Sequence, residues 1–387
     1  MQTPTSPPRP AADPFATLVS PTVLDLKPYV PGKPIEELRR EKGLTEIVKL
    51  ASNENPLGPS PAAAAAIEGC VPHLHRYPDG YGFELKSALA ERWRVDVENV
   101  VLGNGSSEIL EMAVRLLVPP GGAVVVASPS FSIYEITARA QGGEVRRVPL
   151  VDHAVDLDGV LAAVDDATTL VILGNPNNPT GTAFRRRPWE AFLAALPRRV
   201  GVVLDEAYAE YATAPDFPEG REYLDETRPL LVVRTFSKAY GLAALRIGYG
   251  LAPRGLVDYT NRLRLPFNAN GPAQAAALAA LADLDHVRRS REVNREGLER
   301  LYRFCAEQGL EAVPSEANFV LIKVPRAGEM AEALLDHGVI VRWTASFGMP
   351  EWLRVTVGTA PELARFEEAF LQVRGRLGAE CDRGGTR

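Results

Sequence analysis

The chain has 387 residues, of which 43 are lysine or arginine and 49 are aspartate or glutamate, so its net charge is −6. This mild acidity provides no broad basic surface for a phosphate backbone, which excludes nucleic acid as the expected partner. Three widely spaced cysteines, no apolar run of membrane-spanning length and no secretory signal predict a cytoplasmic protein without disulfides or membrane contact.

The N-terminal region reads as an arm followed by a segment with possible site residues. Residues 1–22 are rich in proline and lack periodicity, so we predict that they are disordered. A short helix is expected at 35–43. Residues 48–61, with the sequence VKLASNENPLGPSP, are predicted to be an extended loop and a candidate part of a site.

Between about residues 83 and 237, short apolar runs alternate with amphipathic helices. Strands that are apolar on both faces and separated by helices indicate a mostly parallel sheet covered on both faces by helices. In such sheets, ligands bind beyond the carboxyl ends of the strands. The predicted strands are 123–128, 169–176, 200–207 and 229–237, and the predicted helices are 83–94 and 106–118.

The pattern changes after Pro266. A long helical region at 270–308 precedes three short β-rich runs and a terminal helix at 361–377. We therefore predict an α/β protein with a large domain at 56–267 and a smaller α+β domain at 268–377, followed by a flexible tail at 378–387.

Two motifs do not support the chemistry that they suggest at first sight. Residues 103–108, GNGSSE, begin like a dinucleotide-binding fingerprint but have Glu108 where the third glycine belongs. His73 and His75 lack a third ligand, so two surface histidines are the simpler interpretation and no metal site is expected.

Lys238 directly follows an apolar strand, in VVRTFSKAYGLAALRIG. A lysine at a strand end beside a ligand crevice can form a Schiff base with a carbonyl cofactor. Thr235 and Ser237 provide hydroxyl groups beside it, and Arg246 has a planar guanidinium that suits a phosphate. A single lysine is ordinarily a solvated surface charge, but these companions favour a cofactor site.

A second anion site is indicated at the start of a helix. Gly105, Ser106 and Ser107 lie immediately before or within its first turn, where free N–H groups and the helix dipole attract an anion. An ordinary serine cap would have the same sequence.

Four further residues at predicted strand ends suit an aromatic cofactor. Asp205 can hold a pyridine nitrogen protonated, and Tyr208 can bond a ring hydroxyl. Asn178 lies in a turn after the preceding strand, and Phe131 can stack on a ring. Taken singly, each is also explained as a helix cap, a turn residue or a core aromatic.

Together, these segments resemble the fold type I aminotransferases that use pyridoxal phosphate, and within them the histidinol-phosphate aminotransferase branch. The resemblance covers about residues 23–375. It rests on SNENPLGPS, RYPDGYG, GNGSSE, NPNNPTGT, DEAYAEY and RTFSKAYGLAALRIGY, in the family's order and at its spacings.

The resemblance implies a role for each matching residue. Lys238 would be the Schiff-base lysine and the catalytic base, Asp205 would bind the pyridine nitrogen, and residues 23–55 would join the small domain. Asn178 and Tyr208 would bond the ring oxygen, and Phe131 would stack on the ring. The residues implied to hold the cofactor phosphate are Gly105, Ser106, Ser107, Thr235, Ser237 and Arg246. In the homodimer that the resemblance implies, Tyr77 of the partner chain would join them. The residues implied to bind substrate are Tyr29, Arg342 and Arg354.

The implied reaction is a ping-pong transfer of an amino group from L-histidinol phosphate to 2-oxoglutarate, as in histidine biosynthesis. The same cofactor motifs also occur in aminotransferases that act on phenylalanine and tyrosine, which is the main alternative. A phosphothreonine decarboxylase-like enzyme and a non-catalytic regulator that binds pyridoxal phosphate are further alternatives. The regulator is disfavoured because only a short proline-rich arm precedes Tyr29.

Overall fold

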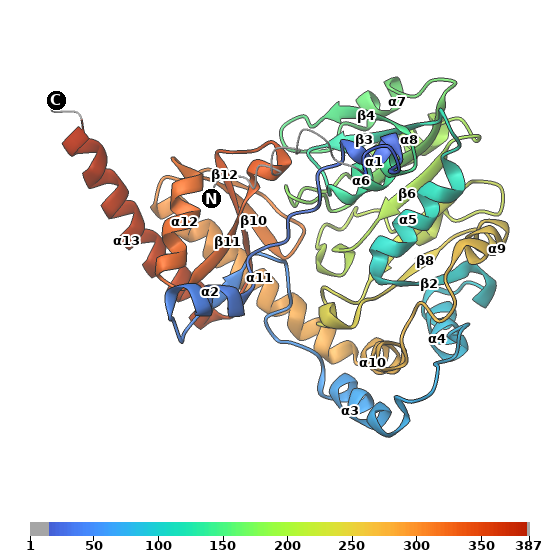
Figure 1. Cartoon of the computed structure of the whole chain (residues 1–387), viewed down its shortest axis with the longest axis horizontal. Helices are drawn as coiled ribbons and strands as arrows, with labels where there is room; N and C mark the ends of the chain where they lie inside the picture. Colours follow the sequence, from blue (N-terminus) through green and yellow to red (C-terminus); the bar gives the residue numbers. More distant parts are fainter. Residues whose placement is uncertain (1–14, 385–387) are drawn as a thin grey trace.

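A large, mostly parallel sheet forms the centre of the larger part of the molecule (Figure 1). The structure is a computed structural model that describes residues 15–384; the disorder predicted for residues 1–14 and the tail predicted at 385–387 lie outside this range. Strands β3 to β7 are parallel, and β8 runs antiparallel to both of its neighbours. In sheet order, the strands are β2 (Val100–Asn104), β8 (Ile247–Leu251), β7 (Leu230–Thr235), β6 (Gly201–Asp205), β5 (Thr168–Gly174), β3 (Ala123–Ser128) and β4 (Glu144–Pro149).

Helices cover both faces of this sheet because its central strands are apolar on both sides. In β3, Val124 and Val126 pack into the core on one face, and Val125 packs into the core on the other. One face carries α5 (Gly105–Leu117), α6 (Ile133–Ala140) and α9 (Arg254–Leu263); the other carries α4 (Phe83–Trp93), α7 (Leu157–Ala162), α8 (Arg186–Ala195) and α10 (Gly271–Ala282). The predicted fold class is confirmed.

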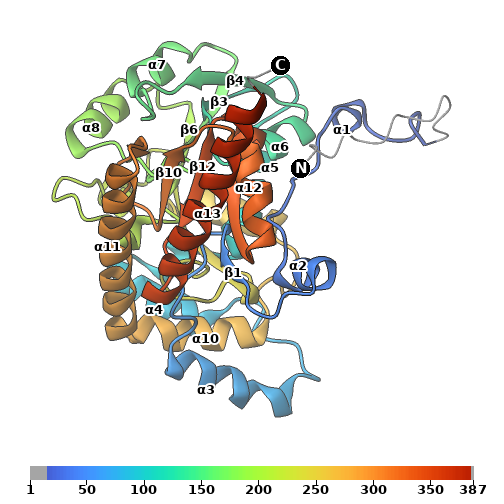
Figure 2. The same cartoon turned by 90° about the vertical axis from the view of Figure 1, so that its left-hand side faces the viewer.

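A second, mixed sheet forms the smaller part of the molecule and includes the N-terminal segment. Strand β1 pairs in parallel with β11, with Val48 opposite Val339, and β11, β12, β10 and β9 follow antiparallel. Figure 2 shows that α11, α12 and α13 lie beside this sheet. The elements are β1 (Val48–Leu50), β9 (Ala312–Val313), β10 (Phe319–Lys323), β11 (Val339–Trp343), β12 (Trp352–Thr356), α2 (Ile35–Lys42), α11 (Leu284–Glu307), α12 (Ala327–Asp336) and α13 (Ala360–Gly384).

The helical region predicted at 270–308 is two helices. The Asp283 side chain accepts a hydrogen bond from the backbone N–H of His286, which ends α10 and begins α11. Although α10 follows the expected boundary at 267/268, it packs against α3 (Pro61–Cys70) and contributes Ala273 to the core of the large sheet. The division into domains at 56–267 and 268–377 stays a prediction.

Both ends of the described chain include helices. Helix α1 (Pro21–Leu24) lies against α6, where the Thr22 hydroxyl donates to the carbonyl of Ala140 over 3.1 Å. At the other end, α13 extends to Gly384, into the segment expected to be a flexible tail. No helix within residues 15–384 is both long and apolar enough to cross a bilayer.

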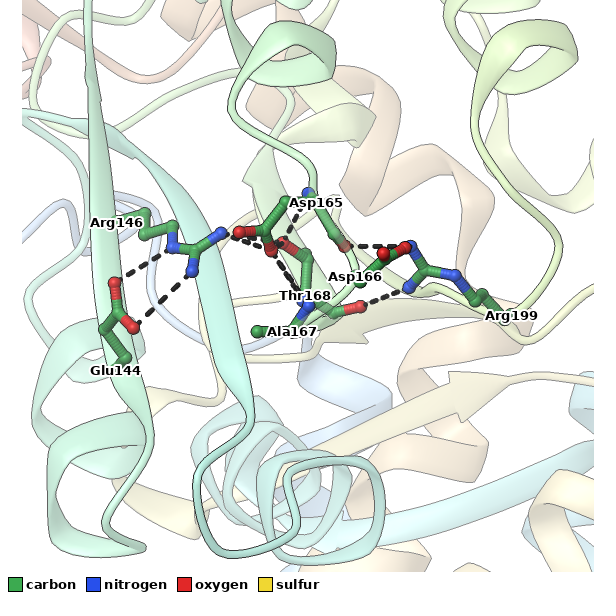
Figure 3. Close-up of polar contacts among 7 residues, drawn as sticks. All are labelled: Glu144, Arg146, Asp165, Asp166, Ala167, Thr168 and Arg199. Atoms are coloured by element: carbon green, nitrogen blue, oxygen red, sulfur yellow. Dashed lines mark hydrogen bonds and ion pairs between the residues drawn. The ribbon is translucent and has the colours of Figure 1, made fainter.

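A polar cluster connects the amino ends of β4, β5 and β6, at the sheet edge opposite the carboxyl ends (Figure 3). Arg146 pairs with both Glu144 and Asp165, and Asp165 accepts a hydrogen bond from the Thr168 hydroxyl. The hydrogen bond from Arg146 is the main reason that the pKa of Asp165 falls to about 2. Arg199 donates to the carbonyls of Asp165 and Thr168. These contacts link β4, β5 and the segment before β6 at the edge opposite the carboxyl ends.

Candidate active site

A cavity of about 180 Å³ lies at the carboxyl ends of the parallel strands, where the large and small sheets meet. It brings together thirteen of the residues that the sequence singled out. These are Tyr29, Ser106, Ser107, Phe131, Asn178, Asp205, Tyr208, Thr235, Ser237, Lys238, Arg246, Arg342 and Arg354. Its lining also includes Ser52, Asn53 and Tyr134, which the sequence had not singled out.

One end of the cavity is built for a tetrahedral anion. Thr235 donates to the Ser237 hydroxyl over 2.9 Å, and Arg246 lies 3.4 Å from the same hydroxyl. The N-terminus of α5 faces this group, and the Asn104 side chain does not cap it. One place is therefore surrounded by the N-terminus of α5, the hydroxyls of Thr235 and Ser237, and the guanidinium of Arg246.

Gly105 is not part of the cavity lining, but it allows the cradle to form. Its φ is +72°, a conformation that glycine adopts without strain. A Cβ atom at this position would lie 2.5 Å from Nη2 of Arg246, so a larger residue would displace the guanidinium.

Asp205 ends β6 and is buried with both carboxylate oxygens engaged. The Tyr134 phenol donates to Oδ2 over 2.8 Å, and the backbone N–H of Ala207 donates to Oδ1 over 3.1 Å. Burial raises the pKa of Asp205 to about 6, while the hydrogen bond from Tyr134 acts in the opposite direction. The two donors favour the ionised carboxylate, which can accept one more hydrogen bond from a cationic ring nitrogen.

Lys238 follows β7 and points into the same cavity. Its Nζ donates to the carbonyl of Ser52 over 3.2 Å and lies 5.6 Å from the centre of the Tyr208 ring. Burial, and to a smaller extent the positive charge of Arg354, lower the pKa of Lys238 to about 8. A larger fraction of this amine is therefore neutral and nucleophilic than for a surface lysine.

Tyr208 and Asn178 form the wall nearest the small sheet. The Tyr208 oxygen accepts a hydrogen bond from Nδ2 of Asn53 over 2.9 Å, and burial raises the pKa of this phenol to about 12. Oδ1 of Asn178 accepts a short hydrogen bond from Nη1 of Arg354. The phenol is neutral at physiological pH and retains its proton for donation.

Two arginines of the small sheet also line the cavity. Arg354 of β12 donates to the Ala51 carbonyl over 2.7 Å, and its Nε is buried without a hydrogen-bond partner among the described residues. Burial lowers the pKa of Arg354 to about 10. Arg342 of β11 donates to the carbonyl of Val30 over 3.0 Å. A buried guanidinium with an unpaired N–H is suited to an anionic ligand.

Two aromatic residues, Tyr29 and Phe131, also line the cavity. The rings of Tyr29 and Phe131 meet edge to face at 6.4 Å, which places the N-terminal segment over the residue expected to stack on a ring. Tyr29 is about half exposed. The N-terminal segment therefore contributes Tyr29 to the cavity lining.

Tyr77 is separate from this cavity. Its side chain is 82% exposed and stacks on Phe267 with ring centres 4.6 Å apart. A single chain does not bring Tyr77 to the residues that it was expected to join. Its role on a partner chain stays a prediction.

Three polar residues of the lining, Ser52, Asn53 and Tyr134, were not singled out from the sequence. Tyr134 lies one helical turn after Phe131 in the chain, so its position on α6 was the available signal. Asn53 belongs to the segment SNENPLGPS, whose conformation could not be deduced from its composition. Its positive φ of 55° turns the chain between β1 and the cavity.

Comparisons with known proteins agree with this geometry. Residues 45–370 match the model of the family "Aminotransferase class I and II". Over 365 residues, the chain is 49% identical to histidinol-phosphate aminotransferase 2 of Pseudomonas fluorescens, covering 94% of this chain and 99% of that protein. The protein of the same name from Pseudomonas aeruginosa is 49% identical over 93% of this chain and 98% of its own length.

A solved structure shows the same fold over nearly the whole chain. Histidinol-phosphate aminotransferase from Sinorhizobium meliloti, determined in complex with pyridoxal-5′-phosphate, aligns with a TM-score of 0.85 at 32% identity. The alignment covers 93% of this chain and 98% of that structure. The family predicted from the sequence motifs is confirmed, and the chain belongs to the class I and II aminotransferases.

Proposed function

We propose that this protein transfers the amino group of L-histidinol phosphate to 2-oxoglutarate by a ping-pong reaction with pyridoxal phosphate. The observation that carries the proposal is the position of Lys238, a partly buried amine in one cavity with Asp205 and the Arg246 cradle. The names of the relatives that are 49% identical over nearly the whole chain support the substrate.

The chemistry of the donor set fits pyridoxal phosphate. The cradle of Ser106, Ser107, Thr235, Ser237 and Arg246 would hold the phosphate. Gly105 keeps this cradle open, because a Cβ there would collide with the Arg246 guanidinium.

The ring would be held by the other residues of the cavity. Asp205 would hold the pyridine nitrogen protonated, and Phe131 would stack on the ring. Tyr208 and Asn178 would donate to the ring oxygen. Each polar group of the cofactor thus has a partner of complementary charge or hydrogen-bonding character.

When bound, the cofactor supplies a carbonyl for condensation with an amine and a ring that stabilises the electron pair left at Cα. Lys238 would first hold the cofactor covalently and then, as a free amine, remove the proton from Cα of the donor and return it at C4′. Its lowered pKa suits a group that must be neutral to accept this proton.

The small sheet would orient the substrates. Arg354 would bind an anionic group of each in turn, because a guanidinium can form paired hydrogen bonds with either a phosphate or a carboxylate. Arg342 and Tyr29, which line the same cavity, would add contacts to the phosphate of the donor. The second half-reaction uses the same groups in reverse, with 2-oxoglutarate as the acceptor.

We also infer a homodimer in which Tyr77 of one chain reaches the cofactor phosphate of the other. Support comes from an exposed aromatic patch, defined here as Tyr77, Tyr81, Phe83 and Phe267. Such a patch is typical of a surface covered by another chain. Location in the cytoplasm stays a prediction from the sequence.

The test compares two amino donors by single-turnover absorbance spectroscopy of the protein loaded with pyridoxal phosphate. Histidinol phosphate and phenylalanine are added separately at matched concentrations, and the loss of the cofactor band is followed. Much faster conversion by histidinol phosphate is expected. A preference for phenylalanine would instead make the protein an aromatic amino-acid aminotransferase.

Two variants check the residues. Lys238→Ala is expected to abolish transamination while keeping the circular dichroism spectrum; full activity would overturn the Schiff-base assignment. Arg354→Ala is expected to slow histidinol phosphate turnover more than phenylalanine turnover. An equal loss with both donors would contradict its role as an anchor for the substrate phosphate.

A further inference from the structure

Asn53 connects the cavity wall to the small sheet through a buried set of hydrogen bonds. Its Nδ2 donates to the Tyr208 oxygen over 2.9 Å, and its Oδ1 accepts from the Thr356 hydroxyl over 3.0 Å. Its backbone N–H donates to the same Thr356 oxygen over 3.0 Å. Asn53 and Thr356 are each at most 2% exposed, so water does not compete for these bonds.

The surrounding donors determine which way the Asn53 amide faces. The backbone N–H of Asn53 can only donate, so the Thr356 oxygen must accept that bond. The Thr356 hydroxyl proton is then free to donate to Asn53, and it requires the amide oxygen on its side. The amide nitrogen therefore faces Tyr208 and donates to it.

This direction has a consequence for Tyr208. Because its oxygen accepts from Asn53, its own proton must point elsewhere, and the ring that carries it lines the cavity. Asn178 is held in a similar way, since its Oδ1 accepts from Arg354 and its NH2 group is turned from that arginine. The two neighbouring groups are both set as donors, an arrangement suited to an anionic oxygen.

We propose that Asn53 is a positioning residue that commits Tyr208 to donating its proton to the ring oxygen of the cofactor. The inference rests on the proposed function, because it assumes that pyridoxal phosphate occupies the cavity. It assigns a role to a residue that does not itself need to touch the cofactor. Through Thr356, which lies two positions after Arg354 on β12, it also links the small sheet to the cofactor wall.

The test measures how much the ring hydroxyl of the ligand contributes to binding. The protein stripped of cofactor is titrated at pH 8 with pyridoxal phosphate and with its 3-deoxy analogue, which lacks the ring hydroxyl. Binding is followed by tryptophan fluorescence. The loss of affinity caused by a substitution is compared between the two ligands, as in a double-mutant cycle.

Asn53→Asp reverses the polarity of the contact with little change of shape. The new carboxylate accepts at both oxygens, so the Tyr208 proton turns toward it and away from the cavity. Affinity for pyridoxal phosphate is expected to fall about tenfold or more, the effect of losing a hydrogen bond to an anion. Affinity for the 3-deoxy analogue is expected to change much less.

Two neutral variants remove the effect of the added charge. Thr356→Val deletes the hydroxyl that orients the Asn53 amide, and we expect a smaller loss that is again confined to pyridoxal phosphate. Thr356→Ser keeps the hydroxyl and is expected to restore the wild-type ratio of the affinities for pyridoxal phosphate and its 3-deoxy analogue. Asn294→Asp places a carboxylate at another buried asparagine, outside the cavity lining, and should leave the ratio of the two affinities unchanged.

The outcomes separate this inference from the proposed function. If the wild-type protein does not bind pyridoxal phosphate, the proposed function fails. If it binds pyridoxal phosphate but Asn53→Asp and Thr356→Val weaken both ligands equally, Asn53 has only a structural role and the inference is overturned. If Asn53→Asp does not fold, the two Thr356 variants decide by the same criterion.

Discussion

The Tyr134 phenol donates a hydrogen bond to Oδ2 of Asp205 over 2.8 Å, and both side chains are buried. Burial raises the pKa of Tyr134 well above its usual value, so it stays neutral and acts as a donor. Tyr134 comes from α6 and Asp205 from the end of β6, so a helix on one face of the sheet holds a carboxylate at its edge.

Tyr134→Phe is expected to raise the pKa of Asp205 further above 6, because the hydrogen bond that opposes the effect of burial is lost. Cofactor binding requires the ionised carboxylate. The pH below which pyridoxal phosphate affinity declines should therefore rise by about one unit or more.

The measurement is the dissociation constant as a function of pH. Tyr249→Phe serves as the control. It removes another buried phenol of the large sheet, which lies on β8 and accepts a hydrogen bond from Trp93 of α4. A uniform loss of affinity in Tyr134→Phe, with no change of midpoint, would contradict the prediction.

Asp205 is expected to make the cofactor-free protein less stable as the pH rises. Its folded pKa of about 6 lies about two units above the usual 3.8, and each unit corresponds to about 1.4 kcal/mol. The folded state therefore binds the proton more tightly. The stabilising contribution is complete below about pH 4 and is lost as the pH rises through 6.

Asp205→Asn should remove this decline, giving a cofactor-free variant about 3 kcal/mol more stable than the wild type at pH 8. Urea unfolding of both proteins at pH 4 and pH 8 provides the measurement. The same pH dependence in the two proteins would show that other groups cause it.

Lys238 should capture the cofactor at a rate that rises with pH around a midpoint near 8, because only the neutral amine attacks a carbonyl. Arg354→Gln removes a nearby positive charge, so the midpoint should move to higher pH. Stopped-flow absorbance at a series of pH values measures it. Arg342→Gln is the control, because the Arg342 guanidinium is not among the main causes of the lowered Lys238 pKa. An equal shift of the midpoint in both variants would refute the assignment of this effect to Arg354.

Tyr77 and Lys238 should complement each other between chains. Lys238→Ala and Tyr77→Ala are each expected to be impaired as homodimers. If Tyr77 reaches the partner's cofactor, a mixed dimer has one site that contains both substitutions. Its other site contains both native residues, Lys238 and Tyr77. Mixing the two inactive or weakened proteins, after unfolding and refolding them together, should therefore restore activity above their sum; no gain would place Tyr77 outside the partner's site.

Glu206→Gln is expected to destabilise the protein by about 3–5 kcal/mol, because it leaves Arg234 buried with an incomplete ion pair. Nη2 of Arg234 lies 2.6 Å from Glu206, and its guanidinium stacks over Trp93 at 4.3 Å. Glu206 directly follows Asp205, so this pair also fixes the end of β6.

The free energies of unfolding are compared by urea unfolding of the cofactor-free proteins. Glu222→Gln, which breaks an exposed pair with Arg186, should change the free energy of unfolding by less than about 1 kcal/mol. Similar effects of the two substitutions would show that burial does not govern the Arg234 pair.

Much of the fold and site followed from local patterns. Apolar runs that end in polar residues identified β3, β5, β6 and β7, and the residues after them meet in the cavity because parallel strands share a carboxyl edge. This is why Asp205 and Lys238 could be named from the sequence alone.

Contacts between distant segments could not be predicted in this way. The bond from Asn53 to Tyr208 spans 155 positions, and nothing in either neighbourhood specifies it. Tyr134 lies one turn before Ala138 on the buried face of α6, as a core aromatic would, and its hydrogen bond becomes visible only when α6 is packed on the sheet. The packing of α10 likewise depends on α3, more than two hundred positions earlier.

Because β1 pairs with β11, the first strand of the chain can complete its pairing only late in synthesis. Val48 leaves the ribosome long before Val339, its partner in the ladder, has been added to the chain. Until then, β1 is an unpaired edge with Leu50 uncovered, a state that invites contact with other chains. A chain that is terminated before Val339 would therefore leave β1 without its partner strand and Leu50 without the core that covers it.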